Sequence, residues 1–306
     1  MEGKLLRHTL RRLGLAVLFV FFVSSCAMLL AHLAPGDATT EMLGQGASPE
    51  AIANERARLG LDRPLLAQYA DWLGHVARLD LGESARYRRP VSDLIGERMG
   101  HTARLGAAAL ALATLIGLPL GVLAGAWPRW AGGLVHTASI GVLSLPPLVS
   151  ALLLVFLGAS TGWFPVGGSH LFLPTMALAL PFAATIQQLQ SQSMAAALAE
   201  PHIVAARARG IPEWRLVWHH ALRDALRPVL AVYGIIIGTL FSGSFVVEFV
   251  TSFPGLGRLM YEALVSRDTY LVAGCAASGA VFLASGTLIA DLLLVSIDPR
   301  LRQEAS

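Results

Sequence analysis

Lysine is almost absent from this chain. Of its 23 basic residues only Lys4 is a lysine, and Lys4 does not lie in a glycine-rich turn. A nucleotide-binding P-loop needs a lysine in such a turn to reach the β- and γ-phosphates of the nucleotide. The chain is therefore not an ordinary P-loop ATPase.

Charge and cysteine are scarce as well. Charged residues make up 14% of the chain, hydrophobic residues 55%, and the mean hydropathy is +0.60. This balance indicates several membrane spans rather than a soluble domain. The two cysteines, Cys26 and Cys275, lie in apolar runs and form neither a disulfide framework nor a metal-type spacing. The net charge of +3 is assigned to the basic bias of cytoplasmic segments, not to nucleic-acid binding.

Six apolar stretches approach or exceed the roughly 20 residues that cross a bilayer as a helix. The first is too long for the core of a cleaved signal peptide, which has about 7–15 residues. The sequence therefore predicts an all-α membrane protein with spans at about 13–33, 105–127, 134–157, 171–189, 229–247 and 271–297. Residues 35–99 have soluble composition, with helix-like pieces at 49–59 and 64–76, and we expect them to pack on the spans.

Basic residues orient these spans. The segments placed inside carry twelve basic residues, whereas the short outer loops carry only Arg258 and Arg267. The long segment 35–99 is exempt, because loops beyond about 60 residues cross regardless of charge. Both termini are thus predicted to be cytoplasmic, and residues 35–99 extracytoplasmic.

Residues 205–228 are unusually polar for this chain. Gly210 favours a helix end, and Pro212 favours the first turn of a second helix. Pro228 is expected to close that second helix before the next apolar run. Its apolar face is predicted to hold Trp214, Trp218, Ala221, Leu222 and Ala225. Such an amphipathic hairpin between two spans is suited to docking onto a partner.

The sequence carries no His-Glu-x-x-His motif, no nucleophile elbow and no paired cysteine cluster. We therefore predict no catalytic residue and no metal site. Ser242 and Ser244 are better explained by small-residue packing. Asp291 in the sixth span has either a functional role or an interaction partner near the membrane interface. At the inner end of the fourth span, helical spacing places Gln187 with Ser191 and Gln188 with Gln192. These four are candidate pathway-lining residues, and together these features indicate a pore or carrier driven by a partner.

Short motifs run in order along nearly the whole chain. They include Leu59-Gly60-Leu61-Asp62-Arg63-Pro64, Asp80-Leu81-Gly82-Glu83-Ser84 and Phe253-Pro254-Gly255-Leu256-Gly257-Arg258-Leu259, with others at 10–14, 35–37, 68–69, 163–165, 168, 267–268, 291–293 and 298–300. In this order they resemble the permease subunits of bacterial ATP-binding-cassette importers for dipeptides, oligopeptides, glutathione and nickel.

The resemblance implies a six-helix permease fold of the type I importers, in the bacterial inner membrane. Residues 194–228 correspond to the cytoplasmic coupling loop that seats in a separate ATPase subunit. The matching or neighbouring positions are Ala205, Ala206, Arg207, Gly210, Glu213, His220, Leu222 and Arg223. The implied partners are a second permease, two ATPase subunits that bind ATP and magnesium, and an extracytoplasmic solute-binding protein.

Some positions depart from the family pattern. Gln188 and Ser191 stand where basic residues are common, and Val204 replaces a polar or basic residue. Pro201 and His202 replace an acidic residue and a tyrosine, and Leu79 replaces a glycine. The solute therefore stays open among peptides, glutathione, nickel and other chelates. Two alternatives from other classes are a self-sufficient secondary transporter and an intramembrane hydrolase using Ser242 or Ser244.

Overall fold

The chain is built from helices. A computed structural model describes residues 2–33, 38–39, 48–78, 80–127 and 130–297, and within these ranges it describes the side chains except those of 2–11, 130–131 and 290–297. No strand occurs in these residues, and an isolated antiparallel bridge pairs Glu83 with Pro90. Motif positions 35–37, 79 and 298–300 and the side chain of Asp291 lie outside the described parts.

The longest helices coincide with the predicted apolar stretches. Among the described residues, five helices are long and apolar enough to cross a membrane, or six if a bent pair counts as one span. The long helices are α1 (Glu2–Leu33), α5 (Val91–Ala126), α8 (Phe172–Leu198), α11 (Leu222–Val250) and α13 (Thr269–Ile297). The predicted all-α membrane fold is confirmed.

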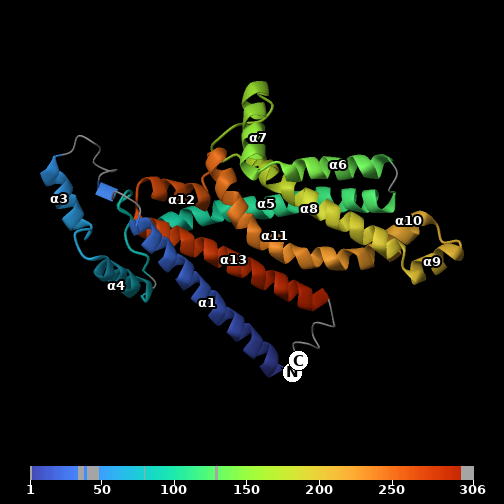
Figure 1. The fold of residues 1–306 in the computed structure, drawn as a ribbon, viewed down its shortest axis with the longest axis horizontal. Coiled ribbons are helices and arrows are strands. Elements are labelled where there is room, and N and C mark those ends of the chain that lie inside the picture. Colours follow the sequence, from blue (N-terminus) through green and yellow to red (C-terminus); the bar gives the residue numbers. More distant parts are fainter. Residues whose placement is uncertain (1, 34–37, 40–47, 79, 128–129, 298–306) are drawn as a thin grey trace. The chain divides into compact units, whose positions relative to one another are not determined.

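The predicted span 134–157 is not one straight helix. It is divided between α6 (Trp130–Ser144) and α7 (Pro147–Thr161), which meet at 101° (Figure 1). Two consecutive prolines cause the break. Pro146 has no N–H to donate, and the following proline holds it in an extended conformation with ψ 143°, while Pro147 is suited to the first turn of α7.

Two compact units divide the chain. The first comprises Met1–Thr9, Ala103–Phe253 and Leu283–Ser306, and the second comprises Leu10–Thr102 and Pro254–Phe282. In the first unit α8 packs against α6, α7 and α11. Its core is rich in alanine, which lets helices approach closely. The fully buried members include Leu105, Ala109, Ala113, Ala151, Ala177, Ala179, Ile186, Val229, Val247 and Phe253.

A close backbone contact in this unit joins α5 to α8. Gly117, Gly121 and Gly125 form one face of α5, at a spacing of four residues. A Cβ at Gly117 would lie 2.6 Å from the carbonyl oxygen of Ala183, and one at Gly125 would lie closer still to that of Ser191. Because no side chain separates the two backbones, only glycine fits this face.

The second unit shows how the segment after the first span packs. Helices α3 (Pro49–Arg58) and α4 (Leu65–Val76) lie where helix-like pieces were predicted. Trp72 of α4 is buried with Met28 of α1 and Ala273 of α13. Tyr69 stacks on Trp72 at 5.7 Å and donates its hydroxyl to Ser25 Oγ at 3.0 Å. The expectation that this segment packs on spans is confirmed for α4.

The glycine face yields a sharp stability prediction. A Cβ at Gly121 would lie 2.5 Å from the Cβ of Gln190 and 2.8 Å from the carbonyl oxygen of Gln187. We expect Gly121→Ala to lower the melting temperature of the detergent-solubilised protein by several degrees, since overpacking a close contact costs about 1–3 kcal/mol.

Gly106 is the matched control. It lies in the same helix, and nothing stands within 4 Å of a Cβ placed there. Gly106→Ala is expected to leave the melting temperature unchanged or to raise it, because alanine is the better helix former by about 1 kcal/mol. Equal melting temperatures for both variants would contradict the close contact between α5 and α8.

Candidate functional site

The polar segment after α8 folds as a helical hairpin, which we define as residues 201–221. Its first arm is α9 (Pro201–Ala208), with Pro201 in the first turn after an extended Glu200. Gly210 then turns the chain at φ +81°, a left-handed conformation that glycine adopts without strain. The second arm contains α10 (Glu213–Arg215) and a π-helix, η1 (Leu216–Ala221). The predicted break at Gly210 is confirmed.

The second arm does not end where the sequence indicated. Residues 213–250 form one helix of 38 residues, and Pro228 lies inside it. The predicted helix end at Pro228 was wrong. Ala225 and Val229, on either side of the proline, are both buried, and this tertiary packing holds the helix together across the missing N–H donor.

The hairpin rests on an apolar cluster of its own. Ile203 and Ala206 of α9 meet Leu216, Val217 and Ala221 of η1. The same cluster contains Val122 of α5, Met194 and Ala197 of α8, and Ala225 of α11. Each of these residues is almost fully buried. The hairpin is therefore fixed to the ends of α5 and α8 and continues directly into α11.

The predicted apolar face of the second arm was only partly right. Ala221 and Ala225 are buried as expected, but Trp214 and Trp218 are exposed, and Leu216 and Val217 take their place. The prediction assumed an α-helical period throughout. A π-helix holds more residues in each turn, so it rotates the following side chains relative to the preceding ones.

Ion pairs tie the arms of the hairpin together. Arg207 of α9 donates two hydrogen bonds to the carboxylate of Glu213, at 2.7 and 3.2 Å. His202 Nε2 of α9 lies 3.3 Å from Oδ2 of Asp224, which follows the second arm in α11, and within α11 Arg227 lies 3.6 Å from Asp224 Oδ1. These pairs are on the surface, where each contributes about 1 kcal/mol or less. They orient the arms more than they stabilise them.

The candidate coupling residues divide between two faces. Ala206 is buried in the cluster, and Leu222 is half-buried against it. The other candidates are exposed on the outer surface of the segment: Ala205, Arg207, Gly210, Glu213, His220 and Arg223. The structure therefore leaves most of these positions accessible to a partner.

The candidate pathway residues also divide. Gln187 is 1% exposed, and its carbonyl oxygen lies against Gly121 of α5, whereas Gln188 and Ser191 are half-buried and Gln192 is exposed. Gln190, which was not among the candidates, is 0% exposed. Among the described residues, the side-chain amides of Gln187 and Gln190 find no hydrogen-bond partner. The sequence feature that could have identified Gln190 is its spacing of three residues from Gln187, which places both on one face of the helix.

Sequence reasoning also missed a buried carboxylate in the second unit. Asp268 Oδ2 accepts hydrogen bonds from Ser84 Oγ at 2.6 Å and from the Arg86 N–H at 3.1 Å, and Oδ1 accepts one from the Leu271 N–H at 3.1 Å. Burial raises the pKa of Asp268, while these hydrogen bonds act in the opposite direction. Asp268 and Ser84 are 184 positions apart, so no sequence spacing could have paired them.

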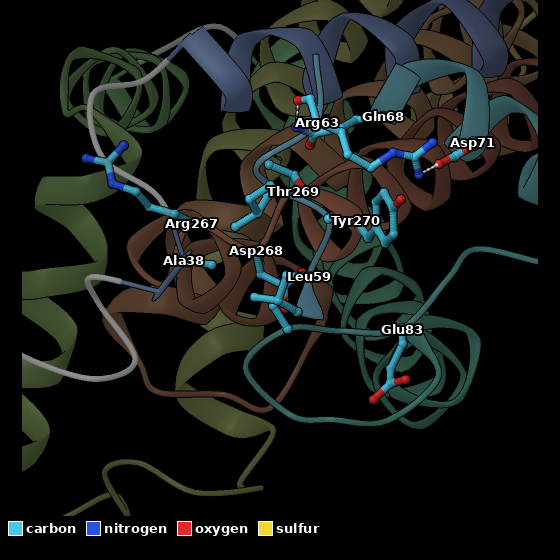
Figure 2. A pocket seen from close by; sticks show the side chains of 13 residues that line it. Ala38, Leu59, Arg63, Gln68, Asp71, Glu83, Arg267, Asp268, Thr269 and Tyr270 are labelled. Atoms are coloured by element: carbon cyan, nitrogen blue, oxygen red, sulfur yellow. Dashed lines mark hydrogen bonds and ion pairs between the residues drawn. The ribbon is translucent and has the colours of Figure 1, made fainter. Parts of the chain in front are cut away.

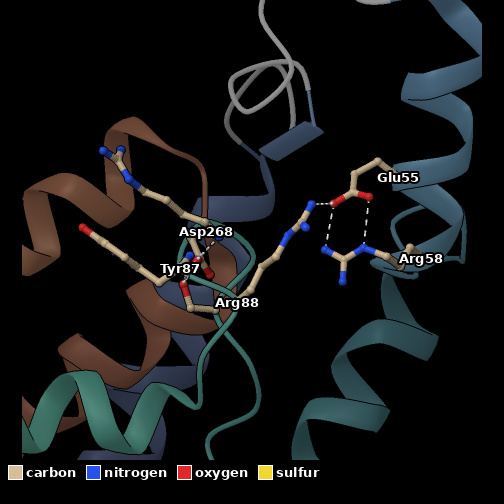
Figure 3. A network of polar contacts seen from close by, with 7 residues as sticks. Glu55, Arg58, Tyr87, Arg88 and Asp268 are labelled. Carbon is tan, nitrogen blue, oxygen red and sulfur yellow. Dashed lines mark hydrogen bonds and ion pairs between the residues drawn. The ribbon is translucent and has the colours of Figure 1, made fainter.

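Neighbouring polar contacts extend this network. Tyr87 donates its hydroxyl to Glu262 at 2.7 Å, and Arg258 donates to the same carboxylate at 3.0 Å. Burial, followed by the contact with Glu262, raises the pKa of Tyr87. In the same unit, the carboxylate of Glu55 in α3 accepts two hydrogen bonds from Arg58, at 2.7 and 3.0 Å, and lies 3.6 Å from Arg88 (Figure 3).

A small cavity of about 100 Å³ lies beside Asp268. Arg63 and Asp71, which both line it, are in contact, and the Arg267 side chain points away from the other labelled residues (Figure 2). Arg267 is one of few non-glycine residues with a left-handed backbone, at φ 55°. The remaining lining residues are Ala38, Leu59, Gly60, Leu61, Gln68, Glu83, Ala85, Thr269 and Tyr270.

Comparison with known proteins identifies the family. Residues 117–303 match the model of the binding-protein-dependent transport system inner membrane component, and residues 5–106 match the model of the N-terminal part of the same membrane components. The chain belongs to this family. It is thus a multi-pass inner-membrane permease subunit of an ATP-binding-cassette importer, a class of transport subunit that is in general not catalytic.

Relatives match over almost their whole length. A putative peptide transport system permease protein of Brucella abortus is 35% identical over 96% of this chain and 98% of its own length. The glutathione transport system permease protein GsiC of Escherichia coli is 32% identical over 97% and 99%. The oligopeptide transport system permease protein AppB of Bacillus subtilis is 32% identical over 96% and 98%.

Removing the buried carboxylate should loosen the second unit locally. Asp268→Ala leaves the Ser84 hydroxyl and the N–H groups of Arg86 and Leu271 without an acceptor, and each orphaned donor costs about 1–3 kcal/mol. We expect hydrogen exchange of the amides in 84–91 to speed up at least about tenfold, since 1.4 kcal/mol corresponds to a factor of ten. Asp62→Ala, which removes an exposed carboxyl of the same unit, is the control and should leave this exchange unchanged.

Proposed function

We propose that this chain forms, together with a second homologous permease, the translocation pathway of an ATP-driven importer. Two separate ATPase subunits bind ATP and magnesium, and an extracytoplasmic binding protein delivers the solute. The family membership supports this assembly, as does the lack of a P-loop lysine in the chain itself. Both termini are placed in the cytoplasm on the distribution of basic residues.

The observation that carries the proposal is the seat of the hairpin. A single apolar cluster joins both of its arms to α5, α8 and α11. Close-packed interiors compress little and transmit displacement. A partner that moves the hairpin therefore moves the inner ends of three spans together. This is the mechanical requirement for switching a pathway between outward-open and inward-open states.

The proposed solute is peptide-like or a metal chelate. The relatives carry the names of peptide, glutathione and oligopeptide transport systems, and we extend that chemistry to this chain. Gln188, Ser191 and Gln192, which keep exposed surface in the C-terminal half of α8, are proposed to line the pathway. Uncharged amides suit peptide groups, because each amide offers both donors and acceptors.

The two alternatives have less support. A secondary transporter needs ionisable groups in its spans to couple an ion gradient, and the predicted spans contain few of them. An intramembrane hydrolase would need a free serine hydroxyl. Ser244 is buried, and its hydroxyl donates to the carbonyl oxygen of Phe241 at 2.9 Å in its own helix, as serines in membrane helices commonly do.

The turn at Gly210 tests the coupling role. A valine there is forced into a left-handed backbone, at a cost of about 1–3 kcal/mol, although nothing stands within 4 Å of its Cβ. In vesicles that hold the complete importer, we expect Gly210→Val to reduce ATP-dependent uptake several-fold while membrane insertion stays normal. Unchanged uptake in this variant would refute the coupling role.

Two controls separate coupling from strain. Gly210→Asn should retain most uptake, because asparagine tolerates the left-handed region. Gly162 has φ +66° and nothing within 4 Å of a Cβ, but it ends α7, away from the hairpin. Gly162→Val imposes the same backbone strain and should leave uptake close to that of the unmodified protein.

A further inference from the structure

The hairpin exposes large apolar side chains at its surface. Trp214 is 54% exposed, Trp218 is 45% exposed, and Val204 of α9 is 49% exposed. We define the two tryptophans as the anchor patch. Tryptophan is among the residues most enriched at the energetic centres of protein interfaces. Two exposed tryptophans one turn apart on an otherwise polar segment therefore require an occupant.

The π-helix holds the tryptophans outward. Trp214 makes an edge contact with the ring of His219, with centroids 5.9 Å apart. These residues are five positions apart, a spacing that an α-helix separates and a π-turn brings together. With Leu216 and Val217 turned into the apolar cluster, Trp218 has no route to the core. The tryptophan side chains therefore point outward because of the packing of the helix, and not because they lie in a surface loop.

The charge around the anchor patch is positive. The carboxylates of the second arm and of the start of α11 are already engaged, Glu213 with Arg207 and Asp224 with His202 and Arg227. Arg215 lies 5.2 Å from the ring centroid of Trp214, in cation–π contact. Within the described part of the chain, no ion pair is formed by Arg209, Arg215 or Arg223. A complementary surface must therefore carry carboxylates around an apolar groove.

The length of the helix that carries the two tryptophans decides whether they can reach the lipid headgroups. Residues 213–250 form one continuous helix. Its apolar part, from Val229 to Val250, is about 33 Å long and fills a hydrocarbon core of about 30 Å. Along the helix axis Trp218 lies about 16 Å, and Trp214 about 22 Å, before Val229. The headgroup region is only about 5–8 Å deep on each side, so the anchor patch stands beyond the lipid.

We propose that Trp214 and Trp218 are the residues that anchor the ATPase subunit, by entering an apolar groove whose rim carries carboxylates facing Arg209, Arg215 and Arg223. This inference rests on the proposed function, since it takes the ATPase as the docked partner. It goes further by assigning the contact to particular side chains and by stating the chemistry of the groove that receives them.

Binding measurements on the full chain in nanodiscs test the anchors. We expect Trp214→Ala and Trp218→Ala each to raise the Kd for the cognate ATPase subunit at least about tenfold, as interface hot spots do. Trp163→Ala, which removes a tryptophan that is 79% exposed elsewhere in the same unit, should leave the Kd unchanged. Replacing Arg209, Arg215 and Arg223 together by glutamine should weaken binding and flatten its dependence on salt.

Fluorescence of the same nanodiscs tests the lipid alternative. The signal of Trp214 and Trp218 is taken as the difference between the unmodified chain and a variant with Trp214→Phe and Trp218→Phe. We expect brominated lipid to leave this signal unquenched and the ATPase subunit to shift its emission to shorter wavelength. Quenching by brominated lipid, without a shift on adding the ATPase, would assign the patch to the membrane surface and overturn the inference.

The failures of the two proposals differ. Unchanged ATPase affinity in both tryptophan variants, together with lost uptake in Gly210→Val, would refute the anchors and keep the coupling role. No binding of any ATPase subunit to the unmodified chain, together with uptake in its absence, would refute the proposed function itself.

Discussion

The contact between α5 and α8 is the constraint on which the first unit depends. Gly117, Gly121 and Gly125 bring the backbone of α5 directly against α8, without a side chain between them. In lipid, helices associate by packing rather than by a hydrophobic driving force, so backbone approach of this kind contributes much of the attraction. It also fixes the position of α8 along the axis of α5. In this position Met194 and Ala197 of α8 pack against the hairpin.

The same contact encloses two glutamine side chains whose amides find no partner within the described residues. Unsatisfied amides are costly in a bundle that is otherwise apolar, and such groups cluster where a structure stores strain or changes state. The hairpin, by contrast, has a fully apolar seat and surface ion pairs that fix its arms.

Much of the architecture could be predicted from the sequence. Long apolar stretches located the membrane helices, and Gly210 marked the turn of the hairpin, because a glycine two residues before a proline favours one helix end followed by a new helix start. Prolines were less reliable. Pro146 and Pro147 broke a span that looked continuous, while Pro228 did not end a helix. A proline removes one hydrogen bond, and whether the helix survives depends on the tertiary packing on either side of it.

The sequence alone determined that this is a membrane protein without a P-loop lysine, since hydropathy and lysine content are properties of composition. Ordered motifs over the whole length indicated the family as well. Only the tertiary structure decided which side of each helix meets protein. Where a helix is apolar all round, hydrophobicity does not distinguish a protein neighbour from lipid. In the second arm, which contains a π-helix, Leu216 and Val217 lie in the core, whereas Trp214 and Trp218 are exposed. The long-range hydrogen bond of Asp268 joins residues 184 positions apart, which only the fold brings together.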